Sequence, residues 1–223
     1  MKKRSVQLVF YSAYCILAIL GLLADFGIFD GTFSTRPFVM YTSWSNMLCS
    51  ACMVISFVRI LRHGESELWP LCKFIFVVMI LITAVVFNIL LNPFKSLMQY
   101  FASAKSSIYH LILPTMFVLD WILFYRRGTV KPLQPLLGAV LPLVYVVYIL
   151  LRAVIVKSAG ITVGLLYPYF FLNVDSLGWG GFIKWLGILL VLLLALGYGL
   201  YGMDRLLYLK MPRKKKTPET GVR

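Results

Sequence analysis

The sequence predicts an all-α, polytopic membrane protein: a bundle of six transmembrane helices with an interfacial or re-entrant segment before the last helix. Hydrophobic residues make up 61% of the chain and charged residues 13%, and the apolar residues gather in six long stretches. A spanning helix needs about 20 mostly apolar residues. The predicted spans are residues 6–28, 38–60, 71–91, 107–125, 136–155 and 182–206. Because the connections are short, residues 1–223 are expected to form a single transmembrane domain.

The first span, residues 6–28, has some features of a secretory signal peptide. Its apolar run is longer than the hydrophobic region of a typical signal, however, and no small-x-small cleavage site ends it. We therefore expect a helix that is retained in the protein.

Lysine and arginine are divided unevenly between the two sides of the predicted bundle. Sixteen of the 22 lie in the N-terminus, the second and fourth loops and the C-terminal tail. Because cytoplasmic loops are enriched in these residues, both termini are expected to be cytoplasmic, and residues 207–223 to form a basic cytoplasmic tail. The net charge of +14 then reflects topology and attraction to anionic lipids. Nucleic acid is not an expected partner, since the basic residues are scattered.

The four cysteines and two histidines give little support to a metal or redox site. Cys49 and Cys52 share a CxxC spacing, which suggests such chemistry in a soluble protein. Here all four cysteines lie in or at the edge of apolar spans, and we interpret them as small apolar residues on packed helix faces. Two histidines, one of them (His63) in a loop, cannot build a His-rich metal site or a bis-histidine haem site. No metal and no cofactor is expected.

Polar residues inside the spans are the best functional candidates, because burying them in a bilayer is costly without a partner or a role. On the second span, Thr42, Ser45 and Asn46 share one stripe at helical spacing. Asn88 lies near the outer end of the third span, and His110 lies about one turn inside the outer end of the fourth. Thr42 and His110 therefore come from different helices at similar depth. The structural alternative is interhelical hydrogen bonding, which contributes roughly 0.6–2 kcal/mol in membranes.

Asp120 shares a face of the fourth span with His110 and lies about 15 Å further inward, at 1.5 Å per residue. At that depth it can pair with a basic residue near the cytoplasmic side, namely Arg59, Arg62 or Arg126. A catalytic role is the alternative to this structural pairing.

The loop of residues 158–180 contains an apolar run too short to span a membrane, broken by Pro168. Such a segment suits an interfacial or re-entrant element, with its aromatic residues at headgroup level, that acts as a lid or as an anchor. On the preceding span, Tyr148 and Arg152 share a face. Arg152 is expected either to extend to the outer headgroups or to meet Asp175 in this loop.

Three short segments carry a resemblance to a known family. Residues 41–48 are YTSWSNML, residues 109–114 are YHLILP, and residues 167–172 are YPYFFL. With the six spans and the lysine-rich tail, they resemble the prokaryotic six-transmembrane family, which is similar to the eukaryotic androgen-induced and androgen-dependent membrane proteins. Those eukaryotic relatives are intramembrane hydrolases of fatty-acid esters of hydroxy fatty acids, with a threonine nucleophile and a histidine.

The resemblance implies that Thr42 is the nucleophile, that His110 is the histidine and that Asp120 stands where the relatives carry an acidic residue. It also implies a bacterial cytoplasmic membrane as the location. A threonine hydroxyl needs a neighbouring base to become a nucleophile, and imidazole titrates in the useful range. We therefore expect His110 to accept the proton of Thr42 during attack on a lipid or fatty-acyl ester.

Three further side chains are expected to support the oxyanion or the polar site: Asn46, Ser45 and Asn88. The alternative function is a non-catalytic membrane protein that binds or transports a lipid or small molecule. Polar residues from several helices that converge at one depth would also line a transport site.

Overall fold

The computed structural model describes residues 2–65, 69–91 and 107–211. Every regular element in these ranges is helical, which confirms the all-α class. The longer helices are α1 (Lys2–Asp25), α2 (Tyr41–His63), α3 (Pro70–Val86), α6 (Leu113–Phe124), α7 (Val140–Ser158) and α8 (Val174–Leu209). The shorter elements are η1 (Ile28–Asp30), η2 (Arg36–Phe38), η3 (Phe87–Leu91), η4 (Ile108–Ile112), η5 (Gln134–Ala139) and η6 (Phe170–Leu172).

Five helical segments are long and apolar enough to cross a membrane, which indicates an integral membrane protein. They are Arg4–Asp25, Tyr41–His63, Pro70–Leu91, Gln134–Ser158 and Val174–Leu209. The fourth predicted span, residues 107–125, is the one that remains, and it coincides with the shorter apolar helix Ile108–Phe124, which η4 and α6 form together. The predicted basic tail begins within the last turn of α8, and its residues 212–223 lie outside the described ranges.

The last helix begins earlier than the predicted residue 182. Asn173 caps α8 by accepting a hydrogen bond from the Ser176 amide at 3.2 Å, which stabilises a helix start at this point. Gly178 then interrupts the helical geometry with φ 65° and ψ 169°, a conformation that glycine adopts without strain. Part of the predicted interfacial segment is therefore the start of α8. The connection that remains, residues 159–173, contains η6.

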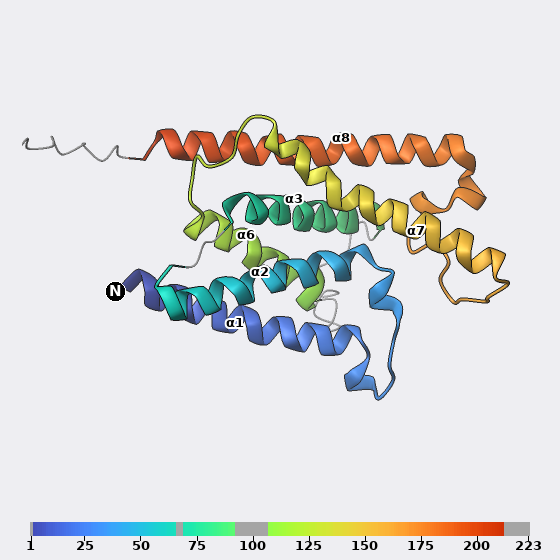
Figure 1. The fold of residues 1–223 in the computed structure, drawn as a ribbon, viewed down its shortest axis with the longest axis horizontal. Coiled ribbons are helices and arrows are strands. Elements are labelled where there is room, and N and C mark those ends of the chain that lie inside the picture. Colours follow the sequence, from blue (N-terminus) through green and yellow to red (C-terminus); the bar gives the residue numbers. More distant parts are fainter. Residues whose placement is uncertain (1, 66–68, 92–106, 212–223) are drawn as a thin grey trace, which may run out of the picture.

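The helices run side by side, with the start of α1 and the end of α8 at the same end of the bundle (Figure 1). The connections 26–40 and 159–173 lie at the opposite end. Helix α1 packs on α2 and α2 on α3, while α3 also contacts α6 and α8. Helix α3 is therefore the central helix, and a side chain on it can meet partners from most of the bundle.

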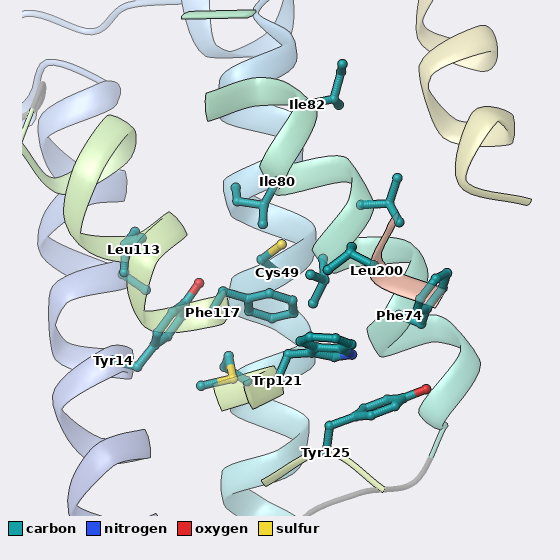
Figure 2. Packing of buried hydrophobic residues seen from close by; sticks show 14 of the residues in the cluster. Tyr14, Cys49, Phe74, Ile80, Ile82, Leu113, Phe117, Trp121, Tyr125 and Leu200 are labelled. Carbon is teal, nitrogen blue, oxygen red and sulfur yellow. The ribbon is translucent and has the colours of Figure 1, made fainter. Parts of the chain in front are cut away.

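Two apolar clusters fill the bundle. The larger one joins α1, α2, α3, α6 and α8, and Figure 2 shows Tyr14, Cys49, Phe117 and Trp121 packed together within it. The second cluster joins α7, the connection after it and the first half of α8, with members from Val39 to Phe182. Residues of this second cluster line part of a cavity.

Candidate functional site

A cavity of about 90 Å³ lies between α2, α3, α7, α8 and the connection 159–173. Its lining residues are Tyr41, Thr42, Ile82, Thr83, Val86, Leu91, Ala139, Pro142, Leu143, Tyr145, Val146, Tyr169, Phe171, Leu172, Leu186, Leu189, Leu190 and Leu193. None of them is charged. An uncharged, mostly apolar cavity inside a membrane protein suits an apolar ligand or the apolar part of an amphiphile.

The polar part of the lining is made of hydroxyl groups. Thr42, at the start of α2, is buried, and its amide donates a hydrogen bond to the Tyr169 hydroxyl at 3.4 Å. The Thr42 side chain also hydrogen-bonds to Tyr169. Burial raises the pKa of the Tyr169 hydroxyl, and the hydrogen bonds from Thr42 lower it in part. Tyr169 thus stays a neutral phenol that holds the predicted nucleophile in place.

Ser45 and Asn46 hold the first turn of α2 from its other side. The Ser45 hydroxyl and the Asn46 amide each donate to the Thr42 carbonyl at 2.9 Å, and Thr83 of α3 donates to Ser45 at 3.0 Å. These two donors therefore bind the backbone of the turn that carries Thr42, and the predicted contact with an oxyanion stays a prediction. Asn88 likewise donates to the Ala84 carbonyl, at 2.7 Å.

His110 lies in η4, and its ring stacks flat on Phe87, with centroids 3.5 Å apart and an interplanar angle of 8°. It is not among the residues that line the cavity. The carbonyl of its neighbour Tyr109 accepts a hydrogen bond from Asn46 at 3.2 Å, and the same amide holds the Thr42 carbonyl. One asparagine thus joins the segment of the threonine to the segment of the histidine.

At the other end of the bundle Asp120 forms an ion pair with Lys73, at 2.6 Å, with side chains 0% and 2% exposed. The predicted structural pairing is found, but the partner is neither Arg59, Arg62 nor Arg126. The partner, Lys73, lies in the first turn of α3 and is buried in the bundle. Because α3 is central, its side chain reaches the carboxylate on α6 directly.

A second buried ion pair lies close to the first. The Arg127 guanidinium lies 3.6 Å from the Asp204 carboxylate and 4.2 Å from the centre of the Trp121 ring. It also donates to the Trp121 carbonyl at 2.9 Å, and the Gly128 amide donates to Asp204 at 3.0 Å. These contacts fasten the connection after α6 to the end of α8.

The remaining predicted residues hold connections in place. Tyr148 donates to the Phe38 carbonyl at 3.2 Å. Arg152 donates to the carbonyls of Leu165 and Leu166 at 3.1 and 2.9 Å instead of meeting Asp175. Asp175 pairs with Lys157, because the early start of α8 brings it beside the end of α7.

Sequence analysis assigned no role to two tyrosines of the cavity lining or to Asp25. Tyr41 and Tyr145 line the cavity, and the Tyr145 hydroxyl donates to the Val39 carbonyl at 2.7 Å. Asp25 is buried at the end of α1, where it accepts a hydrogen bond from Ser43 at 2.5 Å. An acidic residue inside the apolar run 6–28 was the signal for Asp25, whereas tyrosines near a membrane interface are usually interpreted as anchors.

Within the described ranges, no group of three or more His, Cys, Asp or Glu residues is arranged to hold a metal ion. Comparison of the chain with protein-family models, with curated proteins and with solved structures finds no match.

Proposed function

We propose that this protein is an intramembrane hydrolase of lipid esters, such as fatty-acid esters of hydroxy fatty acids, with Thr42 as nucleophile and His110 as base. The observation that carries the proposal is the position of Thr42. This residue lines an uncharged, mostly apolar cavity, at the part of the lining that carries hydroxyl groups. An acyl chain in this cavity would bring its ester group beside a buried threonine. The resemblance of residues 41–48 and 109–114 to the hydrolase relatives supports the same assignment.

The reaction would proceed through an acyl-enzyme. The Thr42 oxygen attacks the ester carbonyl carbon while His110 takes its proton. The carbon–oxygen bond to the leaving alcohol then breaks, and the imidazolium returns the proton to that alcohol. Water activated by His110 hydrolyses the acyl-threonine ester and releases the fatty acid. For this, the His110 ring has to turn from Phe87 towards Thr42, and catalytic contacts are often looser in unliganded structures.

The proposed topology has six spans, with both termini cytoplasmic in a bacterial cytoplasmic membrane. It is supported by the excess of lysine and arginine on the side of the termini, and by the start of α1 and the end of α8 lying at one end (Figure 1). The cavity then opens towards the outer half of the bilayer. The connection 159–173 would act as an interfacial lid, since Tyr169, Phe171 and Leu172 contribute to the cavity lining.

A second candidate function is non-catalytic binding or transport of a neutral lipid. It is favoured by the position of His110, which stacks on Phe87 outside the cavity lining. In that case the hydroxyl groups would hold a polar headgroup without attacking it.

Labelling with a fluorophosphonate probe, which reacts covalently with activated hydroxyl nucleophiles, separates the two functions. We expect labelling of the wild-type protein, and its loss in Thr42→Val and in His110→Ala. Thr83→Val is the matched control, because Thr83 lines the same cavity and also joins two helices. Labelling that survives Thr42→Val would refute the hydrolase mechanism, and equal loss in Thr83→Val would show that the effect is structural.

A further inference from the structure

Arg36 is an unpaired cation at the end of the bundle where the connections 26–40 and 159–173 lie (Figure 1). It is the first residue of η2, and it is exposed. Among the residues that the structure describes, none forms an ion pair or a hydrogen bond with its guanidinium. Two other basic residues at this end are occupied, since Arg152 binds backbone carbonyls and Lys157 pairs with Asp175. Arg36 is therefore able to bind an anionic group of a ligand.

The segment that carries Arg36 is fastened to the cavity lining. Val39, which follows η2 directly, is buried in the same apolar cluster as Tyr145 and Tyr169. Both tyrosines line the cavity, and the Tyr145 hydroxyl donates to the Val39 carbonyl at 2.7 Å. The chain then continues into the first turn of α2, which carries Thr42. Arg36 is thus held a few residues from the cavity on the side of the proposed nucleophile.

The charge of Arg36 reaches the hydroxyl group that is bonded to Thr42. It acts electrostatically on the Tyr169 hydroxyl, and Tyr169 is a buried residue of the cavity lining. The same hydroxyl accepts a hydrogen bond from the Thr42 amide at 3.4 Å. At physiological salt, exposed charges interact over about 8 Å before ions screen them. The guanidinium is therefore close to the part of the cavity that contains Thr42.

The cavity and the guanidinium together suit an amphiphile with an acidic group. No lining residue is charged, so a carboxylate inside the cavity would lose its hydration without gaining a counter-charge. A carboxylate that stays outside the lining, beside Arg36, keeps contact with water and gains a counter-charge. A guanidinium can also donate two parallel hydrogen bonds to it. An ester of a hydroxy fatty acid carries one free carboxylate in addition to its ester group.

We propose that Arg36 is a specificity-determining residue, which binds the free carboxylate of the substrate while the ester group lies beside Thr42. The inference rests on the proposed function, because it assigns a further residue to the same site. It predicts that the protein distinguishes acidic esters from neutral ones. An acidic ester is bound by its chains and its carboxylate, whereas a neutral ester of the same size is bound by its chains alone.

Binding is tested in Thr42→Val protein in phosphatidylcholine nanodiscs, so that no ester is consumed. The probes are palmitoyl-hydroxystearate and its methyl ester, in which the carboxylate is masked. We expect Arg36→Gln to weaken binding of the free acid about tenfold and to leave binding of the methyl ester unchanged. Comparison of variants in the same nanodiscs cancels the different partitioning of the two probes into lipid. Equal affinity of both proteins for the free acid would overturn the proposal.

Lys184→Gln is the matched control. Lys184 is a second exposed cation, in the first half of α8 and outside the cavity lining. Its substitution should leave the affinity for the free acid unchanged, and a loss equal to that of Arg36→Gln would overturn the proposal by showing a general effect of surface charge. Arg36→Lys should lose only part of the affinity, because lysine keeps the charge without the planar fork of the guanidinium.

Salt and lipid composition test the charge itself. High salt should weaken binding of the free acid to the protein with Arg36, and it should have little effect in Arg36→Gln. A phospholipid phosphate is the other anion that a guanidinium could bind at this level. Adding phosphatidylglycerol to the nanodiscs should therefore leave most of the preference for the free acid. Loss of the preference there would assign Arg36 to lipid headgroups and overturn the proposal.

Turnover separates binding from chemistry. In protein that retains Thr42, Arg36→Gln should raise the KM for the free acid about tenfold and leave kcat unchanged, since the carboxylate contact is the same before and during the reaction. The unfolding temperature should also stay unchanged, because the guanidinium has no partner among the described residues. A fall in kcat with an unchanged KM would contradict a role in binding. The hydrolase mechanism fails by a different result, namely hydrolysis that survives Thr42→Val, and the binding assay does not depend on hydrolysis.

Discussion

The two ends of the bundle bury polar groups in different ways. The hydroxyl end, made of Thr42, Ser45, Asn46 and Tyr169, consists of uncharged side chains beside a cavity, and one buried carboxylate, Asp25, accepts a hydrogen bond from the neighbouring Ser43. The ion-paired end, made of Lys73, Asp120, Arg127 and Asp204, carries four charges in two buried pairs. A buried charge persists only where its partner and its hydrogen bonds compensate it. The charges at the ion-paired end therefore compensate each other, whereas the side chains of the hydroxyl end carry no charge and lie beside a cavity with an uncharged lining.

Because of this difference, two polar residues on the same face of one predicted span have different roles. Asp120 and His110 share one helical segment, but Asp120 belongs to the ion-paired end and His110 to the side of the hydroxyl end. We infer that the ion-paired end keeps α3, α6 and α8 together and that the hydroxyl end serves the ligand. Four substitutions test this division, in order of decreasing effect on stability.

Asp120→Asn should have the largest effect. It leaves Lys73 as an uncompensated buried charge, and breaking a buried ion pair costs about 3–5 kcal/mol. We expect a strongly reduced yield of folded protein and a lower unfolding temperature. The double substitution of Lys73→Met with Asp120→Leu should restore much of the loss, because it removes both charges. A stable Asp120→Asn protein that had lost only turnover would instead assign Asp120 to catalysis.

Tyr169→Phe should have an intermediate effect. It removes the acceptor of the Thr42 amide and side chain, and a buried hydrogen bond of this kind contributes about 1 kcal/mol. The unfolding temperature should fall by a few degrees, and any hydrolysis should fall further, because the threonine is no longer held. Tyr148→Phe, whose hydroxyl bonds an exposed backbone carbonyl, should change neither. Full activity in Tyr169→Phe would show that the connection 159–173 does not position Thr42.

Thr42→Val should change stability less, since valine keeps the shape of threonine and interhelical hydroxyl contacts contribute about 1 kcal/mol or less. Ester hydrolysis should nevertheless be abolished, because the nucleophile is gone. Folded yield and hydrolysis of a fatty-acid ester of a hydroxy fatty acid, measured on the same preparation, check the prediction. A loss of stability with hydrolysis intact would assign Thr42 a purely structural role.

Most of the fold could be predicted from the sequence. A long apolar run in a membrane forms a helix, because a helix satisfies all its backbone hydrogen bonds within the segment. The start of α8 was missed, since it depends on a cap at Asn173 and a kink at Gly178 inside an apparent loop. The partner of Asp120 was missed for a similar reason. A lysine at the end of a span suggests a loop charge, and only the packing of α3 shows that Lys73 faces inward.

The candidate site could be predicted in part. The spacing of Thr42, Ser45 and Asn46 placed them on one stripe, and they do form one network. The role of Tyr169 could not be predicted, because it depends on the path of the chain after α7. Sequence periodicity gives the face of a helix, but it does not give the atoms that meet across the bundle.

Asp175→Asn should have the smallest effect and provides the contrast to Asp120→Asn. Lys157 and Asp175 form an ion pair, but their side chains are 45% and 49% exposed. Water and salt screen a pair at the surface, and such pairs add little to stability. We expect the unfolding temperature and hydrolysis of Asp175→Asn to match the wild type, at both low and high salt. A marked loss at low salt that high salt removes would show that the connection 159–173 depends on charge as well, and the division between the hydroxyl end and the ion-paired end would then fail.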